Sequence, residues 1–409
     1  MTHTEGTLTP IPAKTVAGTH QHRQPLAVFA LGFRPFFLVA GLAAVGLVSL
    51  WLADYGGALS VRTYYGAINW HGHEMVFGYT AAVVAGFLLT AVRNWTALDT
   101  LRGARLAALL ALWVAGRLAP FAPSAIPGWL IATVDVAFLP ALAASLAVPL
   151  FRSRQWRNLL FVPVLLLLAF ANALVHLDVL GVAPGRATTG LYLGVNLIVL
   201  LIAIIGGRVI PLFTKNALPG AHPRTWRLVE WVSIGAVAAL AVLGTLPVVA
   251  DLTLTLAAVA AVAHAVRLWG WYDRRLWSVP LLWILHTGYA WLVVGLGLEA
   301  FSAAAMVRPQ LALHAFTAGA IGALPLGMMA RVALGHTGRP LRAASPVVAA
   351  FILVNVAALL RVFAAWSLPD EWYVALVVAA GAAWASAFVL FVAVYAPILT
   401  RARVDGRPG

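Results

Sequence analysis

Apolar segments long enough to cross a lipid bilayer recur from one end of this chain to the other. A transmembrane helix needs about 20 consecutive apolar residues, and only helices or closed barrels satisfy their backbone polar groups within lipid. Charged residues make up 10% of the 409 residues, against roughly 25% in an average soluble protein. We therefore predict an all-α, polytopic integral membrane protein with about 12 transmembrane helices, at approximately 26–53, 71–92, 104–122, 128–151, 157–178, 188–210, 227–247, 249–271, 276–302, 309–331, 345–368 and 371–397.

The connections between these segments are short and leave no room for a separate soluble module. We expect a polar cytoplasmic tail at residues 1–24, a single 12-helix transmembrane domain at 25–400 and a second cytoplasmic tail at 401–409. The first tail lacks an apolar stretch after a basic start, so it does not resemble a signal peptide. Three connections carry longer motifs, which we interpret as elaborate cytoplasmic loops: RNWTALDT, GGRVIPLFTKNALPG and ARVALGHTGRP.

The basic residues are distributed unequally between the two sides of the predicted bundle. The chain has a net charge of +14 and 27 lysines and arginines. Nearly all of them fall at the N-terminus, at alternate connections and at the C-terminus, and the exceptions are Arg62, Arg117, Arg186, Arg308 and Arg361. Because cytoplasmic loops are rich in lysine and arginine, we predict that both termini are cytoplasmic. This bias accounts for the basic charge, and no nucleic-acid partner is needed to explain it.

Several histidines and two arginines gather in the predicted outer half of the bundle. His71, His73 and Glu74 lie at the outer end of the second segment, and His314 lies five residues, or roughly 8 Å, below the outer end of the tenth. Arg117 and Arg361 fall in the outer third of their segments. A lone arginine at such depth costs at least about 2.5–3.5 kcal/mol, and intramembrane acids are few. A non-protein anion, such as a haem propionate, is therefore an attractive partner.

A metal cofactor is one of two interpretations of these histidines, and a structural role is the other. The chain has no cysteine, so its metal ligands must be histidine, carboxylate, methionine or tyrosine, and histidine suits haem iron or copper. A helix cannot point residues i and i+2 at one spot. His71 and His73 could therefore serve two centres on opposite faces, or bind one metal if the helix begins after them. Glu74 could orient a ligand or cap the helix, and His176 and His264 are more simply structural.

Small residues follow the candidate histidines at helical spacing. His71, Met75, Gly78, Ala82 and Gly86 form one stripe, and small residues recur below His314. Such stripes either let helices pack closely or leave a flat slot for a planar macrocycle, and close packing is the commoner role. Pro325 lacks the N–H that would bond the carbonyl of Ile321.

Long motifs spread over nearly the whole chain resemble the NnrS family. They are GFRPFFL (32–38), WHGHEMVFGYTAAVVAGFLLTAV with NWT after it, GRVIPLFTKN (207–216), LHTGYAWL (285–292) and HAFTAGAIGALPLGMMARVALGHTGRPL (314–341). The resemblance implies a multi-pass protein of the bacterial cytoplasmic (inner) membrane that contains haem and copper. It also implies a link to nitric oxide and to protection from nitrosative stress.

The resemblance supplies no ligand assignment, so depth and spacing must suggest one. We expect one haem, guessed to be of the b type, between the second and tenth segments, held by His314 with His73 or His71. Arg117 and Arg361 would pair with its propionates. The copper would take the remaining histidine of the HGH motif and a further imidazole such as His286. The inner-face Arg34, Arg208 and Arg331 either organise the loops or bind a second cofactor, and His336 is not assigned.

Three functions from different classes are compatible with the sequence. The first is a haem–copper protein that binds or turns over a diatomic ligand such as nitric oxide, with electrons from quinol or a partner protein. The second is a sensor or metal-handling protein without catalytic turnover. The third is a secondary transporter, because twelve spans with intramembrane polar residues also describe that class. The sequence does not decide whether the protein is an enzyme.

Overall fold

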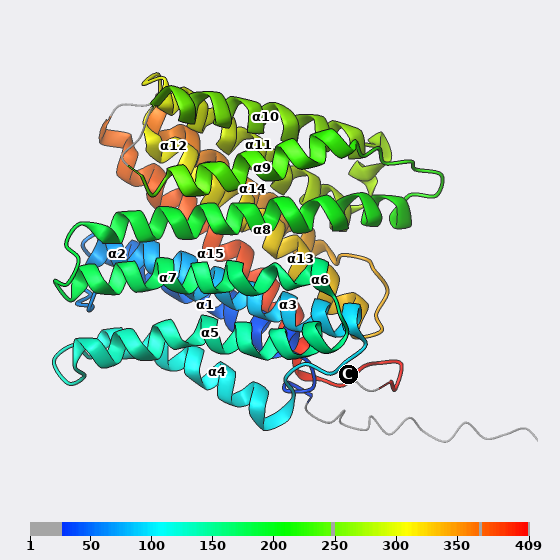
Figure 1. The fold of residues 1–409 in the computed structure, drawn as a ribbon, viewed down its shortest axis with the longest axis horizontal. Coiled ribbons are helices and arrows are strands. Elements are labelled where there is room, and N and C mark those ends of the chain that lie inside the picture. The colour runs from blue at the N-terminus through cyan, green and yellow to red at the C-terminus, as the bar shows by residue number, and fades with distance from the viewer. Residues whose placement is uncertain (1–26, 247–249, 368–369, 408–409) are drawn as a thin grey trace, which may run out of the picture.

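The computed structural model describes residues 27–246, 250–367 and 370–407. The predicted tail at 1–24 lies outside these residues. The described chain is helical, as predicted, and runs back and forth as a bundle (Figure 1). Its elements are α1 (Phe33–Tyr55), α2 (Ala67–His73), the π-helical segment η1 (Glu74–Thr80), α3 (Ala81–Thr96), α4 (Gly103–Leu118), α5 (Gly128–Arg152), α6 (Trp156–Leu159), α7 (Phe161–Val179), α8 (Arg186–Ala217), α9 (Arg227–Leu243), α10 (Ala250–Trp271), α11 (Pro280–Ala303), α12 (Pro309–His314), the π-helical segment η4 (Ala315–Ile321), α13 (Gly322–His336), α14 (Ser345–Ser367) and α15 (Asp370–Thr400), with short 3₁₀ turns at Ala119–Phe121 and Arg274–Ser278.

These elements form twelve helical rods, because α2, η1 and α3 are continuous, as are α12, η4 and α13, and α6 leads into α7. Eleven of the rods are long and apolar enough to span a membrane. The twelfth, α9, has 17 residues, or about 26 Å of helix, slightly less than the roughly 30 Å of a hydrocarbon core. It covers most of the predicted segment 227–247, whose last residue lies outside the described part of the chain. The chain is therefore a polytopic helical membrane protein.

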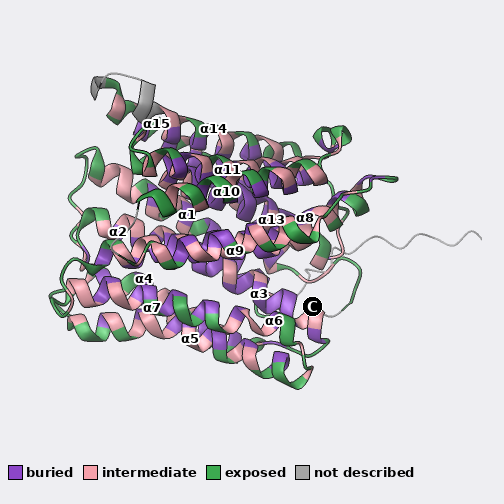
Figure 2. Cartoon of the chain, turned by 45° about the horizontal axis from the view of Figure 1, so that its top comes forward, coloured by how far each residue is buried: buried purple, intermediate pink, exposed green. Residues whose placement is uncertain are grey.

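The two rods that carry the candidate histidines form the centre of the bundle. Within their most apolar stretches, 83% of residues are buried in Ala67–Thr96 and 78% in Pro309–His336, more than in any other candidate span. Figure 2 shows this buried interior along α3 and α13. The first and last rods, α1 and α15, pack against each other, and α1 also packs on α3. Both histidine-bearing rods are therefore shielded from lipid along most of their length.

The two ends of the bundle differ in their residues. One end carries the arginine-rich connections and the last described residues, and we call it the basic end. The other carries the starts of α2 and α12, and we call it the histidine end; Figure 1 shows α2 and α12 at the end opposite the C-terminus. The buried side chain of Arg34 at the basic end donates hydrogen bonds to the carbonyl oxygens of Leu399 (3.1 Å) and Arg401 (2.6 Å). It thereby ties the start of α1 to the end of α15.

The helices at the basic end differ from the sequence-based bounds. The first helix begins at Phe33 rather than near residue 26, because Pro35 fits the first turn of a helix but not its interior. The segments 207–216 and 330–336, interpreted as loops, are helical parts of α8 and α13. Arg208 donates to Asn158 (2.8 Å) and Arg331 lies over the ring of Phe213 at 4.1 Å. These two arginines at the basic end therefore contact protein groups near the helix ends.

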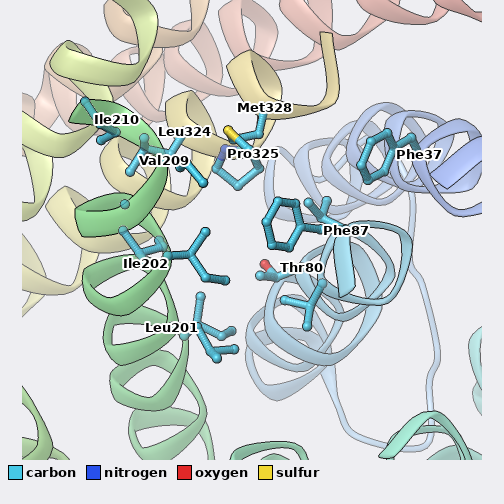
Figure 3. A pocket seen from close by; sticks show the side chains of 15 residues that line it. Phe37, Thr80, Phe87, Leu201, Ile202, Val209, Ile210, Leu324, Pro325 and Met328 are labelled. Atoms are coloured by element: carbon cyan, nitrogen blue, oxygen red, sulfur yellow. The ribbon is translucent and has the colours of Figure 1, made fainter. Parts of the chain in front are cut away.

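A small apolar cavity of about 80 Å³ lies between α1, α3, α8 and α13 (Figure 3). It sits on the basic-end side of both π-helical segments, with Phe37, Phe87 and Met328 in its wall. Thr80 brings the one hydroxyl group in the lining, and this hydroxyl donates to the carbonyl of Met75 (2.6 Å). Apolar cavities of this kind stay dry and hold small uncharged molecules.

Candidate metal centre

Both candidate histidines stand directly before a π-helical segment. His73 ends α2 and η1 follows it, and His314 ends α12 and η4 follows it. Such segments are rare and occur frequently at functional sites, because they leave some carbonyl groups without their usual partner. The indole N–H of Trp113 on α4 donates to the carbonyl of Gly78 in η1 (3.1 Å). The hydroxyl of Tyr79 in η1 donates to the carbonyl of Ile321 in η4 (3.4 Å), the carbonyl expected to be freed by Pro325.

The side chains of His73, Asp135 and His176 form a buried group that could hold a metal ion. One ligand atom from each lies within 4.8 Å of the others. Oδ2 of Asp135 on α5 lies 2.9 Å from Nε2 of His73 and 3.0 Å from Nε2 of His176 on α7. All three side chains are almost inaccessible, with relative exposures of 0%, 4% and 1%. Two imidazoles and a carboxylate are a donor set that suits zinc, copper or iron.

The hydrogen bonds around His73 show that a positive charge belongs beside its Nε2 atom. Its Nδ1 atom lies 3.2 Å from Oε1 of Glu74, so Nδ1–H donates to that carboxylate. The Nδ2 group of Asn172 donates to Asp135 (3.0 Å), which turns its oxygen toward Nε2 of His73 at 2.8 Å. Nε2 therefore faces two oxygen acceptors, Asp135 Oδ2 and Asn172 Oδ1. Either a proton or a metal ion must lie between them.

Tyr65, in the connection before α2, contacts all three members of the His73–Asp135–His176 group. Its hydroxyl lies 3.2 Å from Nε2 of His73, 3.3 Å from Nε2 of His176 and 3.4 Å from Oδ2 of Asp135. Burial, and then the negative charge of Asp135, raise the pKa of Tyr65 well above its ordinary value. The phenol therefore keeps its proton and donates to the carboxylate of Asp135.

Arg117 on α4 joins the two buried acids. Its guanidinium donates to Oδ1 of Asp135, and its NH1 atom lies 3.3 Å from Oε2 of Glu74. Arg117 therefore has two acidic partners within the protein, so it does not need the non-protein anion that the scarcity of intramembrane acids suggests. Arg117, Glu74 and Asp135 together carry one positive and two negative charges, so the group has a net charge of −1 while both imidazoles are neutral. A cation at the His73–Asp135–His176 group would balance it.

Two glycines allow this cluster to form by close approach. A Cβ atom at Gly116 would lie 2.6 Å from Oδ1 and 3.2 Å from the Cα atom of Asp135. A Cβ atom at Gly78 would lie 2.7 Å from Oε2 of Glu74. Gly86 would meet the ring of Phe37 at 2.8 Å. The glycine stripe below His71 is therefore covered by protein side chains, which supports the close-packing interpretation at Gly78 and Gly86.

His71 belongs to a different group on the opposite side of the same helix. Helix α2 begins at Ala67, so both histidines of the HGH motif are helical and point to opposite sides. The ring of His71 stacks on Trp51 of α1 with centroids 4.2 Å apart. Its Nδ1 atom is buried and has no hydrogen-bond partner among the described residues. His71 and His314 are within electrostatic range of each other, and both are within range of Arg361. The three predicted site residues His71, His314 and Arg361 are thus near enough to interact electrostatically, and no hydrogen bond or ring contact joins them within the described residues.

The tautomer of His314 leaves one of its nitrogen atoms available. Nδ1–H donates to the carbonyl of Gln310 at 2.7 Å, so Nε2 carries the lone pair. A histidine that ligates a metal commonly donates its other N–H to a carbonyl in this way. His314 therefore has the hydrogen bonding expected of a ligand.

Three further histidines lie apart from these two groups. His286 is the seventh residue of α11, about 9 Å from the basic end. Its Nδ1–H donates to the carbonyl of Leu282 (3.1 Å), and its Nε2 atom is buried with no hydrogen-bond partner among the described side chains and backbone groups. His264 accepts from Tyr289 (2.6 Å) and donates to the carbonyl of Ser233 (3.2 Å), which fits the structural role expected of it. His336 lies 3.5 Å from the amide of Asn94. A copper-binding role for His286 stays a prediction.

Asp135 is not identified from the sequence, and His176 is interpreted there as structural, although both belong to the group that could hold a metal. Asn172 and Tyr65, which form hydrogen bonds to that group, are not identified from the sequence either. A signal for Asp135 is present in the sequence, because it is an acid inside the apolar segment WLIATVDVAFLP. Ionisable residues at membrane depth mark functional sites by default.

The fold and this site define a polytopic helical membrane protein with a buried His–Asp–His group near one end of the bundle. The family model described as NnrS protein matches residues 27–403. The match covers nearly the whole chain, and the chain therefore belongs to the NnrS family. A search of curated proteins finds no match to it.

Replacing Gly116 by alanine should lower the thermal stability of the protein, because Gly116 packs against Asp135 of the candidate metal site. Glycine to alanine in a helix interior normally stabilises by up to about 1 kcal/mol, but here the new methyl group would push α4 away from the backbone of α5, at a cost of about 1–3 kcal/mol. Gly235→Ala on α9 is the matched control, because nothing lies within 4 Å of a Cβ atom there. Thermal unfolding in detergent should rank Gly116→Ala below both the parent and the control. Equal melting temperatures for the two variants would contradict this account.

Arg117 and Asp135 should show strong energetic coupling. Arg117→Met leaves two carboxylates buried beside each other without their cation, and such a loss costs about 3–5 kcal/mol. Asp135→Asn in the same chain removes one of those charges, so the double variant should be more stable than Arg117→Met alone. Unfolding by denaturing detergent measures this double-mutant cycle, with the exposed Arg186→Met at the same end as control. Additive effects of the two substitutions would show that the ion pair is not coupled.

Proposed function

We propose that this protein holds copper at His73, Asp135 and His176 and haem between His71 and His314, and that it binds nitric oxide in protection from nitrosative stress. The observation that carries this proposal is the environment of His73 Nε2, which faces oxygen acceptors inside a buried group with a net charge of −1. The NnrS family match, whose resemblance implies both cofactors, supports their identity. A transition-metal ion in place of a proton would satisfy both the acceptors and the charge.

The residues around His71 and His314 fit a haem. His314 has a free Nε2 atom, oriented by its bond to Gln310, and His71 has a buried nitrogen without a partner. Within the described residues no ring contact joins the two imidazoles, although they are within electrostatic range of each other. Arg361 is within range of both rings, and a guanidinium there would pair with a propionate. We assign Arg117 to the carboxylates of the copper group rather than to a propionate.

The chain's own residues would position and protect these centres. When bound, haem iron takes nitric oxide as a direct ligand and copper supplies an electron or a second binding site. Tyr65 holds a proton 3.4 Å from Asp135 and beside both imidazoles. Arg117 fixes the carboxylate of Asp135 and, with Glu74, the orientation of the His73 ring. The apolar cavity on the basic-end side of η1 and η4 suits a small uncharged molecule.

This proposal places the protein in the bacterial inner membrane, with the histidine end outside and electrons drawn from quinol or a partner protein. A sensor or metal-handling protein would use the same centres without turnover, so that function is the second candidate. The buried Asp135 group favours both over a secondary transporter, because its polar groups bind one another.

Metal content should separate the two groups of histidines. His73→Ala and His176→Ala should lower copper severely and leave most of the haem, whereas His71→Ala and His314→Ala should abolish or shift the haem absorption and keep copper. The exposed loop variant His222→Ala is the control and should retain both. Reduced-minus-oxidised spectra with iron and copper analysis of the same purified samples measure this. A parent protein with neither metal at stoichiometric level, despite intact folding, would sink the proposal.

Nitric oxide should change the haem spectrum of the parent protein and leave His314→Ala unaffected. A nitric oxide electrode in the same cuvette, with a reductant present, distinguishes an enzyme from a sensor. Sustained consumption of nitric oxide marks an enzyme, and stable binding without consumption marks a sensor. No spectral response in a haem-loaded sample would remove nitric oxide as the ligand.

A further inference from the structure

A second cavity, lined by polar and apolar side chains, lies at the histidine end between α8, α10, α11 and α12. Its volume is about 170 Å³, enough for several water molecules by the usual criterion of roughly 10–15 Å³ each. Five oxygen-bearing side chains line it: Tyr192, Asn196, Thr253, Glu299 and Ser302. Each is only partly buried, because it faces the cavity. The proposed metal centre uses none of them.

Within the described part of the chain, none of the polar atoms of these five side chains makes a side-chain hydrogen bond or ion pair. Polar groups in native structures are nearly always hydrogen-bonded. Because these side chains are partly accessible, their partners are water or an ion in the cavity.

Glu299 is the one acidic side chain among the described residues that line the cavity. It lies four residues before the end of α11 at Ala303, which places it about 6 Å inside the bundle. No arginine, lysine or histidine among the described residues forms a salt bridge with it, and Tyr192 is close enough to feel its charge. A carboxylate at membrane depth is costly unless a positive charge accompanies it.

The cavity is separate from the proposed haem site. Pro309, Ala312, Leu313 and Phe316 line it from α12 and η4, and they follow the i, i+3, i+4, i+7 pattern of one helix face. His314 is two positions from Phe316 and so points to the opposite side of the helix. A ligand in the cavity would not contact the imidazole of His314.

From these observations we infer that the cavity binds a hydrated monovalent cation such as Na⁺ or K⁺. Donors that are all oxygen select hard cations over transition metals. A single carboxylate matches one positive charge, whereas a divalent ion would leave an excess charge in a low-dielectric site. Asn196, about 15 Å from the start of α8, and Ser302 near the end of α11 line the cavity at different depths. An ion there can keep part of its water shell.

The test is the thermal stability of the purified, detergent-solubilised protein in NaCl, KCl or choline chloride at matched ionic strength. At about ten times the dissociation constant, a bound cation should raise the melting temperature by about 2 °C over choline. The shift should saturate with concentration, disappear in Glu299→Gln and weaken in Ser302→Ala. Binding of radioactive ²²Na⁺ to the same samples gives a direct second readout.

Asp251→Asn is the matched control, because it removes an exposed carboxylate from the same end of the bundle and should keep the full response. Equal stability in choline and in both salts would overturn the inference, as would an undiminished response in Glu299→Gln. If Glu299→Gln fails to fold, Ser302→Ala and Tyr192→Phe carry the test through the affinity for ²²Na⁺. Haem and copper contents should be unchanged in all of these variants, so the result is independent of the metal centre.

Discussion

The ion pairs of Arg117 are the interaction on which the candidate site depends. Its guanidinium binds Asp135 on α5 and reaches Glu74 in η1, and these acids in turn orient His73. Asp135 also receives hydrogen bonds from Asn172 and Tyr65 and lies against His176. Buried charges of this kind contribute little net stability but are costly to separate. Their consequence is positional, because one guanidinium fixes the relative placement of four helical rods.

A second constraint follows from the placement of two histidines two residues apart on one helix. Successive residues of an α-helix are about 100° apart, so His71 and His73 must face nearly opposite directions. His73 faces α5 and α7, where Asp135 lies. His71 faces Trp51 of α1 and lies within electrostatic range of Arg361. The rod Ala67–Thr96 therefore separates two potential metal centres, whose histidines lie within one helical turn of each other. A single cofactor could not engage both imidazoles without unwinding α2.

Much of the fold could be predicted from the sequence, because in lipid the backbone allows few alternatives. The lengths of the apolar runs predict the twelve rods. The main errors at helix ends come from Pro35 and from α8 and α13, which continue into segments predicted as loops. It is harder to predict which side of each helix a residue occupies. A stripe drawn at 3.6 residues per turn from His71 to Gly86 crosses η1, and a π-helical segment rotates everything after it by about 100°. Gly78 and Gly86 consequently meet Arg117 and Phe37 rather than a shared slot.

The site itself was predicted only in part, because its ligands come from separate helices. His73 was identified from its own segment, but Asp135 and His176 become neighbours only through the packing of α5 and α7 on the central rod. Spacing along the chain carries no information about that contact. The same limit explains why Arg117 was expected to need a foreign anion, since its carboxylates are 43 and 18 residues away in the sequence.

The distribution of polar groups suggests what kind of ligand the bundle serves. The acids and imidazoles of the candidate site are gathered at the histidine end, and on the basic-end side of η1 and η4 the described interior opens into a cavity lined almost entirely by hydrocarbon. A charged solute would lose its hydration there without compensation, whereas a small uncharged molecule would lose little. Two π-helical segments joined by the Tyr79–Ile321 bond lie at this boundary. That arrangement favours a small, uncharged ligand in the apolar cavity, on the basic-end side of the candidate metal site.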